Sequence, residues 1–95
     1  MILKYVYTKE EQIILRKIMQ RIKKAWQQLI EDRKNLDNLL AQNAQIEDVM
    51  HANKWVWRDY YEIEALLDLV IVTHGISTYD MRNRLLKYVL HGRTK

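Results

Sequence analysis

One stretch of the chain decides its fold: residues 8–40, which read TKEEQIILRKIMQRIKKAWQQLIEDRKNLDNLL. Thr8 followed three residues later by Glu11 is a capping-box pattern, which marks the start of a helix. Behind it, apolar residues recur at alternating spacings of three and four, the period of one helix face. The pattern predicts one long helix over about residues 9–42. Its apolar residues are Leu15, Ile18, Ile22, Ala25, Leu29, Leu36 and Leu39.

A turn is predicted next, at residues 41–45, which contain no large apolar side chain. Asn43 in this turn is a residue type that can take the left-handed backbone conformation that ends a helix. Beyond it the same spacing returns and predicts a second helix over about residues 45–73. The residues of this second series are Ile46, Val49, Asn53, Val56, Tyr60, Ile63, Leu67 and Val70.

The end of the second helix, residues 66–72, is apolar on nearly every side. Residues 69–73 alone also fit a short buried strand. Because the chain offers no second strand to pair with them, we expect a buried helix instead. His74 and Gly75 then provide a basic residue and a glycine stop.

A third helix is predicted over about residues 78–90, where Ser77 followed by Asp80 forms a cap pattern. The predicted fold is therefore all-α, a single helical domain over residues 1–95 with a long antiparallel hairpin and a shorter C-terminal helix. A helix of 30 residues is about 45 Å long, whereas a compact chain of this size has a radius of gyration of about 12 Å. We therefore expect packing as an intertwined dimer or against a partner, or else a break in the first helix near residues 33–35.

Composition excludes several classes of protein. The chain has 95 residues with no cysteine and no proline, which excludes disulfide scaffolds and thiolate metal sites. No apolar run approaches the roughly 20 residues that span a bilayer, and the N-terminus lacks the layout of a secretory signal, so we expect a cytoplasmic protein without membrane contact. The net charge of +4 conceals basic patches over residues 16–24 and 82–95, with an acidic stretch over residues 31–68.

Charged residues also fall on otherwise apolar helix faces. Asp68 and Arg82 are expected to pair across the short turn between the second and third helices. With two further residues they predict a buried polar network, which either fixes helix register or forms an anion or proton-transfer site. The members of this network are Arg33, Glu64, Asp68 and Arg82.

The sequence provides no pattern for catalysis. The three histidines share no ligand spacing with each other or with nearby acids, so we expect no metal site and no cofactor. No serine or cysteine lies in a nucleophile motif, and no glycine-rich phosphate loop occurs. The residues favour binding over enzymatic activity.

An aromatic and basic cluster stands out at residues 54–61. Trp55 and Trp57 point to nearly opposite sides of a helix, so both cannot enter the same core, and one is expected on the surface. Exposed tryptophan beside arginine is typical of a protein-interface hot spot, and also of a surface that stacks single-stranded bases. The predicted interface residues are Trp55, Trp57, Arg58 and Tyr61.

As an alternative function, the basic residues predict a surface that binds nucleic acid. A helix face that is simply exposed to solvent would explain the same residues equally well. Residues 69–86 resemble a helix-turn-helix unit, with the turn at Gly75-Ile76-Ser77 and with Met81 and Leu85 behind it. That resemblance implies a second helix that offers Thr78, Tyr79, Arg82 and Asn83 to a major groove. The residues predicted to contact nucleic acid are Arg16, Lys17, Lys23, Lys24, Arg82, Asn83 and Lys87.

A second resemblance involves the first helix. Leu15-Arg16 together with residues 29–36 is similar to the first helix of the all-helical chorismate mutases, which form intertwined dimers of three helices per subunit. That resemblance implies, as an alternative function, a small helical enzyme of the chorismate mutase type, with Arg16 and Arg33 as the family's two arginines of the first helix. Among these hypotheses we favour a small basic regulator or inhibitor, of the kind made by bacteria and phages, that docks on a protein or nucleoprotein partner and forms a homodimer.

Overall fold

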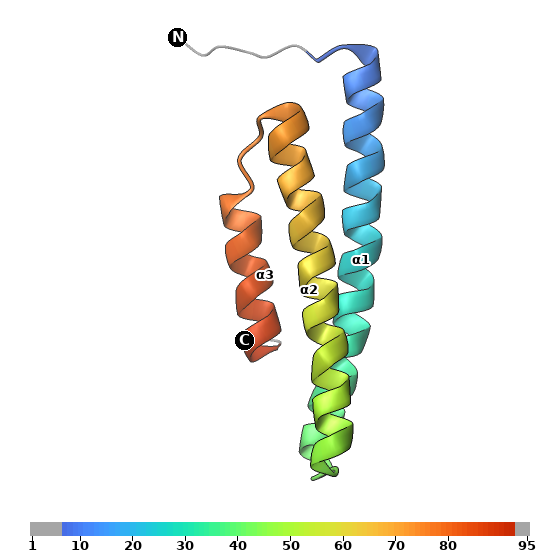
Figure 1. Cartoon of the computed structure of the whole chain (residues 1–95), viewed down its shortest axis with the longest axis vertical. Coiled ribbons are helices and arrows are strands. Elements are labelled where there is room, and N and C mark those ends of the chain that lie inside the picture. Colours follow the sequence, from blue (N-terminus) through green and yellow to red (C-terminus); the bar gives the residue numbers. More distant parts are fainter. Residues whose placement is uncertain (1–6, 93–95) are drawn as a thin grey trace.

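The computed structural model describes residues 7–92 and consists of three helices, α1 Lys9–Ala41, α2 Ile46–His74 and α3 Tyr79–His91 (Figure 1). Each helix end lies within one residue of the position expected from the sequence. No strand occurs in this part of the chain, so the segment at residues 69–73 is helical. None of the described helices is long and apolar enough to cross a membrane.

The residues predicted to begin and end the two long helices do so. The Thr8 side chain accepts a hydrogen bond from the backbone N–H of Glu11 at 3.1 Å, and the Thr8 N–H donates to the Glu11 carboxylate at 2.8 Å. This capping box fixes the start of α1. Asn43 has a φ of 54° and Gly75 a φ of 65°, so both take the left-handed conformation that turns the chain.

The predicted cap of α3 is wrong. The N-cap residue is Thr78 rather than Ser77, and its side chain makes no capping hydrogen bond. The Thr78 hydroxyl instead accepts a hydrogen bond from Nε of Arg82 at 2.9 Å. Without a side-chain cap, α3 depends on packing, through the buried Leu85 and Val89.

The core lies between α1 and α2, which run antiparallel over most of their length (Figure 1). α1 is continuous through residues 33–35, so the predicted break does not occur. Leu29 of α1 and Val56 and Ile63 of α2 have no exposed surface. The other buried apolar residues are Ile18, Ile22, Ala25, Leu36, Ala52, Leu66, Leu67, Val70, Leu85 and Val89.

The end of α2 is less buried than expected. Leu67 and Val70 face the core, but Leu69 is 42% exposed and Val72 is 81% exposed. The prediction of a helix buried all round is therefore wrong for residues 69–72. The physical reason is that the described neighbours of this end of α2, which are α1, α3 and Tyr7, cover one side of it.

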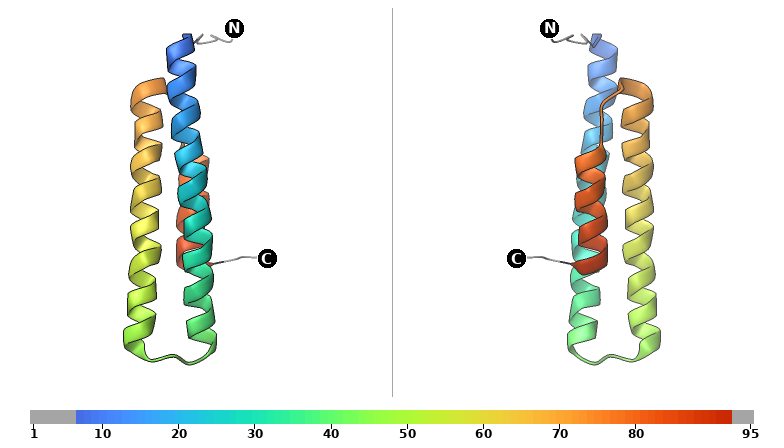
Figure 2. Two further views of the ribbon diagram at one scale, coloured as in Figure 1. Left: turned by 90° about the vertical axis from the view of Figure 1, so that its right-hand side faces the viewer. Right: turned by 90° about the vertical axis from the view of Figure 1, so that its left-hand side faces the viewer.

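The molecule is elongated, with dimensions of 55 × 26 × 17 Å and a radius of gyration of 16.4 Å. That radius exceeds the value of about 12 Å for a compact chain of this length. The elongated shape accommodates the two long helices within one chain. α3 lies beside the middle of the hairpin, from about Met19 to Arg33 of α1, and leaves the end near residues 42–45 uncovered (Figure 2).

The arrangement of α2 and α3 differs from a helix-turn-helix unit. α3 runs back alongside α2 in the opposite direction (Figure 1). The two helices of a helix-turn-helix unit instead cross at about 90–120°, which presents the second one to the major groove. Residues 69–86 therefore lack the geometry that the resemblance implied.

Candidate functional site

The four residues predicted as a protein interface line one hollow on α2, but they differ in exposure. Trp55 is 42% exposed and Tyr61 is 64% exposed, whereas Trp57 packs against the core, as expected for residues that point apart. The aromatic face, as we call this surface, encloses a hollow of about 580 Å³. It is lined by His51, Lys54, Trp55, Trp57, Arg58 and Tyr61.

Contacts within the aromatic face hold its side chains in place. The Arg58 guanidinium carbon lies 4.9 Å from the centre of the Trp55 ring, a cation–π contact. The indole N–H of Trp55 donates a hydrogen bond to Nε2 of His51 at 3.1 Å. Tyr61 packs against Trp57 with ring centres 6.2 Å apart. Side chains held in this way lose less conformational entropy when a partner binds.

An acidic pocket lies on the other side of Trp55, between α1 and α2, with a volume of about 420 Å³. At its base Asp59 is 6% exposed, and no group donates a hydrogen bond to its Oδ2. Burial raises the pKa of Asp59 to about 7, and a hydrogen bond with the Asp32 side chain and the nearby negative charges add to the rise. Below that pH the Asp59 carboxyl is protonated. The pocket is lined by Gln28, Asp32, Trp55, Arg58, Asp59 and Glu62.

Sequence reasoning missed Asp59, although its spacing gave a signal. The buried series of α2 runs through Ala52, Val56, Asp59 and Ile63, with steps of four, three and four. The sequence prediction placed Asn53 and Tyr60 in this series because of their position and, for Tyr60, its apolar ring. In the structure Asn53 is exposed and Tyr60 is half-buried.

The predicted polar network divides into two separate sites. Arg82 forms an ion pair with Asp68 and lies 3.7 Å from a carboxylate oxygen of Glu64, so the expected contact between α2 and α3 is present. Arg33 takes no part in it. Its guanidinium donates to the carbonyl of Val89 at 2.8 Å and pairs with Asp37 at 3.1 Å. The expectation of one four-residue network is therefore wrong.

The Arg82 cluster is also less buried than predicted, since the Asp68 side chain is 64% exposed and that of Arg82 is 26% exposed. Removing either partner should therefore cost only about 1 kcal/mol of unfolding free energy, as for other solvent-exposed ion pairs. A double-mutant cycle with Asp68→Ala and Arg82→Ala, measured by urea unfolding, should give a coupling of about 0.5–1 kcal/mol. The same cycle on Asp80 and Lys87 should give none. A coupling of several kcal/mol would contradict the exposed geometry.

The basic residues predicted for nucleic acid are spread over α1 and α3. Arg16, Lys17, Lys23 and Lys24 are exposed on α1, and Asn83 and Lys87 are exposed on α3. Arg82 is held by two carboxylates and by Thr78, so its charge is compensated within the chain. The structure thus leaves six of the seven residues accessible but does not gather them around Arg82.

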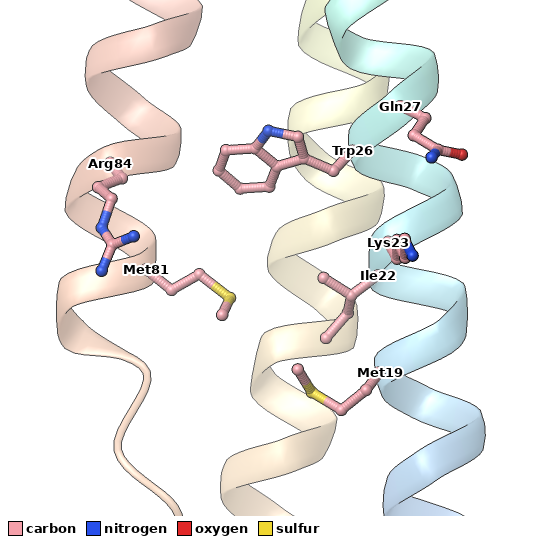
Figure 3. Close-up of a pocket in the computed structure, with 7 residues that line it drawn as sticks. All are labelled: Met19, Ile22, Lys23, Trp26, Gln27, Met81 and Arg84. Atoms are coloured by element: carbon pink, nitrogen blue, oxygen red, sulfur yellow. The ribbon is translucent and has the colours of Figure 1, made fainter.

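A groove between α1 and α3 was not predicted (Figure 3). Met19 and Trp26 of α1 face Met81 of α3 across a hollow of about 400 Å³. Lys23 and Arg84 stand at its two walls. A second hollow of about 490 Å³ continues it toward the start of α3 and shares Met19, Met81 and Arg84. No sequence pattern could have found this groove, because it depends on how far α3 stands from α1.

In the described part of the chain, no three histidine or acidic side chains cluster closely enough to hold a metal ion. Comparison with models of known protein families, with curated proteins and with solved structures gives no match. The geometry of these surfaces is therefore the basis for a functional proposal.

Proposed function

We propose that this protein is a non-enzymatic regulator or inhibitor that binds another protein through the aromatic face of α2. The observation that supports the proposal is a single hollow lined by exposed Trp55, Arg58 and Tyr61 and by the partly buried Trp57. Tryptophan, tyrosine and arginine are the residue types that dominate binding energy at protein interfaces. A large indole left 42% exposed in the free chain favours a surface that a partner covers.

The charges of the aromatic face favour an acidic partner segment. His51, Lys54 and Arg58 line the hollow beside the rings, and no carboxylate does. A partner that inserts an apolar side chain between the rings would place acidic neighbours close to these bases. Binding by this surface should therefore weaken as salt concentration rises. A homodimer, as expected from the sequence, stays part of this proposal, with the second copy as one partner.

The proposal is tested by site-specific photo-crosslinking. A photoreactive phenylalanine in place of Tyr61 should crosslink a discrete protein in a lysate of the source cells, with and without nuclease. The crosslinked protein is then purified, so that its affinity can be measured directly. Crosslinking that disappears after nuclease treatment would contradict a protein partner and favour single-stranded nucleic acid on the same rings.

With the purified partner, Trp55→Ala should weaken binding by about 2 kcal/mol, or about 30-fold, the usual effect of a hot-spot residue. Folding should stay nearly intact, because Trp55 lies outside the buried core. The matched control is Tyr79→Ala, which removes an aromatic side chain 69% exposed on α3. Equal affinities for Trp55→Ala and the unmodified protein, measured by calorimetry, would rule out the aromatic face as the interface.

A further inference from the structure

The groove between α1 and α3 is open because α3 is held to α1 at one end only. Near its C-terminus, the carbonyl of Val89 accepts a hydrogen bond from Arg33 of α1 at 2.8 Å. Toward the start of α3, the Met81 side chain faces Met19 and Trp26 across the groove and α3 stands off α1 (Figure 3). The opening extends along α1 from Leu15 to Gln27, about 18 Å at 1.5 Å per residue.

The groove lies at the position that a fourth helix would occupy in a helix bundle. α1, α2 and α3 occupy three corners of a bundle, and Leu67 and Val70 of α2 form the floor between the other two. Four-helix bundles fill the fourth corner with a helix whose apolar side packs into such a groove. Methionine side chains adapt their shape to a bound helix, and this groove has one on each wall, Met19 and Met81.

The charges around the groove select the kind of helix that would fit. Lys23 and Arg84 stand on opposite walls, and Asp80 of α3 is the one carboxylate among the lining residues. α1 contains eight basic and five acidic residues, and α3 contains three basic and one acidic residue. A helix that carries glutamate or aspartate on both sides of its apolar stripe would therefore place negative charge against both walls.

A second copy of this chain fits the groove poorly. Its acidic helix is α2, with six acidic and two basic residues. The exposed apolar residues of α2 include Ile46, Met50, Leu69, Ile71 and Val72, and none of them lines the groove. Copies joined through these residues and the groove would form an open head-to-tail chain rather than a closed dimer.

We infer that the α1–α3 groove binds an acidic amphipathic helix of another protein, which completes a four-helix bundle. The helix places its apolar side against Met19, Trp26 and Met81 and its acidic flanks against Lys23 and Arg84. This surface is distinct from the aromatic face, so the protein has two binding surfaces and can join two partners, or two segments of one partner.

The test uses designed peptides of about 20 residues, long enough to exceed the groove. One peptide has a leucine stripe flanked by glutamate, and the other has the same stripe flanked by lysine. Fluorescence anisotropy with the full chain should show the acidic peptide binding at least about tenfold more tightly than the basic one at low salt. Equal affinities for the two peptides would overturn the inference.

Charge reversal locates the binding. Lys23→Glu with Arg84→Glu should invert the preference, so that the basic peptide binds more tightly. The matched control is Lys17→Glu with Lys24→Glu, which changes the net charge equally at exposed positions outside the groove. If this control inverts the preference as well, net charge rather than the groove selects the peptide, and the inference fails.

Two further measurements separate the inference from other outcomes. Trp55→Ala should leave acidic-peptide binding unchanged, so a loss there would assign the peptide to the aromatic face. Light scattering should show that Lys23→Glu with Arg84→Glu leaves the mass of the free protein unchanged. A decrease from a larger mass would instead identify a second copy as the occupant of the groove.

Discussion

Replacing Arg33 with methionine is expected to lower the free energy of unfolding by about 3 kcal/mol. Arg33 is 9% exposed, and its guanidinium connects α1 to α3. It donates to the carbonyl of Val89, in the last turn of α3, where carbonyl groups have no partner within the helix. Its positive charge also stabilises this C-terminal end of the helix dipole. Methionine keeps the apolar volume, so the loss reports the missing hydrogen bond and charge.

The measurement is urea unfolding followed by far-ultraviolet circular dichroism. The control is Arg21→Met, at an exposed position of α1, which should change stability by less than about 0.5 kcal/mol. The Arg33 side chain also leaves no room for a side chain at Gly92, where a Cβ atom would lie 2.9 Å from Nε of Arg33. Equal stabilities for the Arg33 and Arg21 variants would mean that α3 does not depend on this contact.

Stability is expected to fall as pH rises from about 4 to about 7, because of Asp59. Its pKa is about 7 in the folded protein and 3.8 without that environment. Between these values the folded state binds more protons than the unfolded state, so this contribution is complete below pH 4 and is lost as pH rises through 7. Converting the whole pKa difference at about 1.4 kcal/mol per pKa unit gives an upper bound on the change in unfolding free energy. We expect a decrease of about 2 kcal/mol, because the pocket around Asp59 is open to water.

Asp59→Asn isolates this effect. The amide stays neutral at every pH and can donate a hydrogen bond to Asp32, as the protonated acid does. The variant should therefore be more stable than the unmodified protein at pH 8 and should differ little from it at pH 4. Glu31→Gln, at an exposed position of α1, is the control. Thermal unfolding curves that shift in parallel with pH for Asp59→Asn and the unmodified protein would contradict the raised pKa, since all other carboxylates are common to both.

The sequence predicted the helices well because the signals that end a helix are local. Thr8 with Glu11, Asn43 and Gly75 each act within one turn of the chain, so their effect needs no knowledge of the rest of the fold. Periodicity then fixed which face of each long helix is buried. The cap of α3 was misassigned because Arg82 competes for the Thr78 hydroxyl, a contact that exists only after the helix has formed.

The site was predicted less completely, because its parts depend on contacts between helices. The aromatic face lies on one helix, and spacing alone was enough to gather Trp55, Arg58 and Tyr61. The partner of Arg33 is a backbone carbonyl of α3, which has no sequence signature. The groove likewise depends on the distance of α3 from α1, which no single segment encodes.

The short third helix divides the molecule into two zones of different opening free energy. Around Leu29, all three helices exclude water, and backbone amides there should exchange hydrogen only when the whole chain unfolds. Near residues 42–45 only α1 and α2 pack together, so the amides there can exchange when these two helix ends separate, without unfolding of the whole chain. Neither proposed binding surface includes residues 42–45. The groove lies beside the protected zone around Leu29, and the aromatic face lies on α2 between that zone and the open end of the hairpin. A partner seated on the aromatic face would therefore slow exchange at residues that it does not touch.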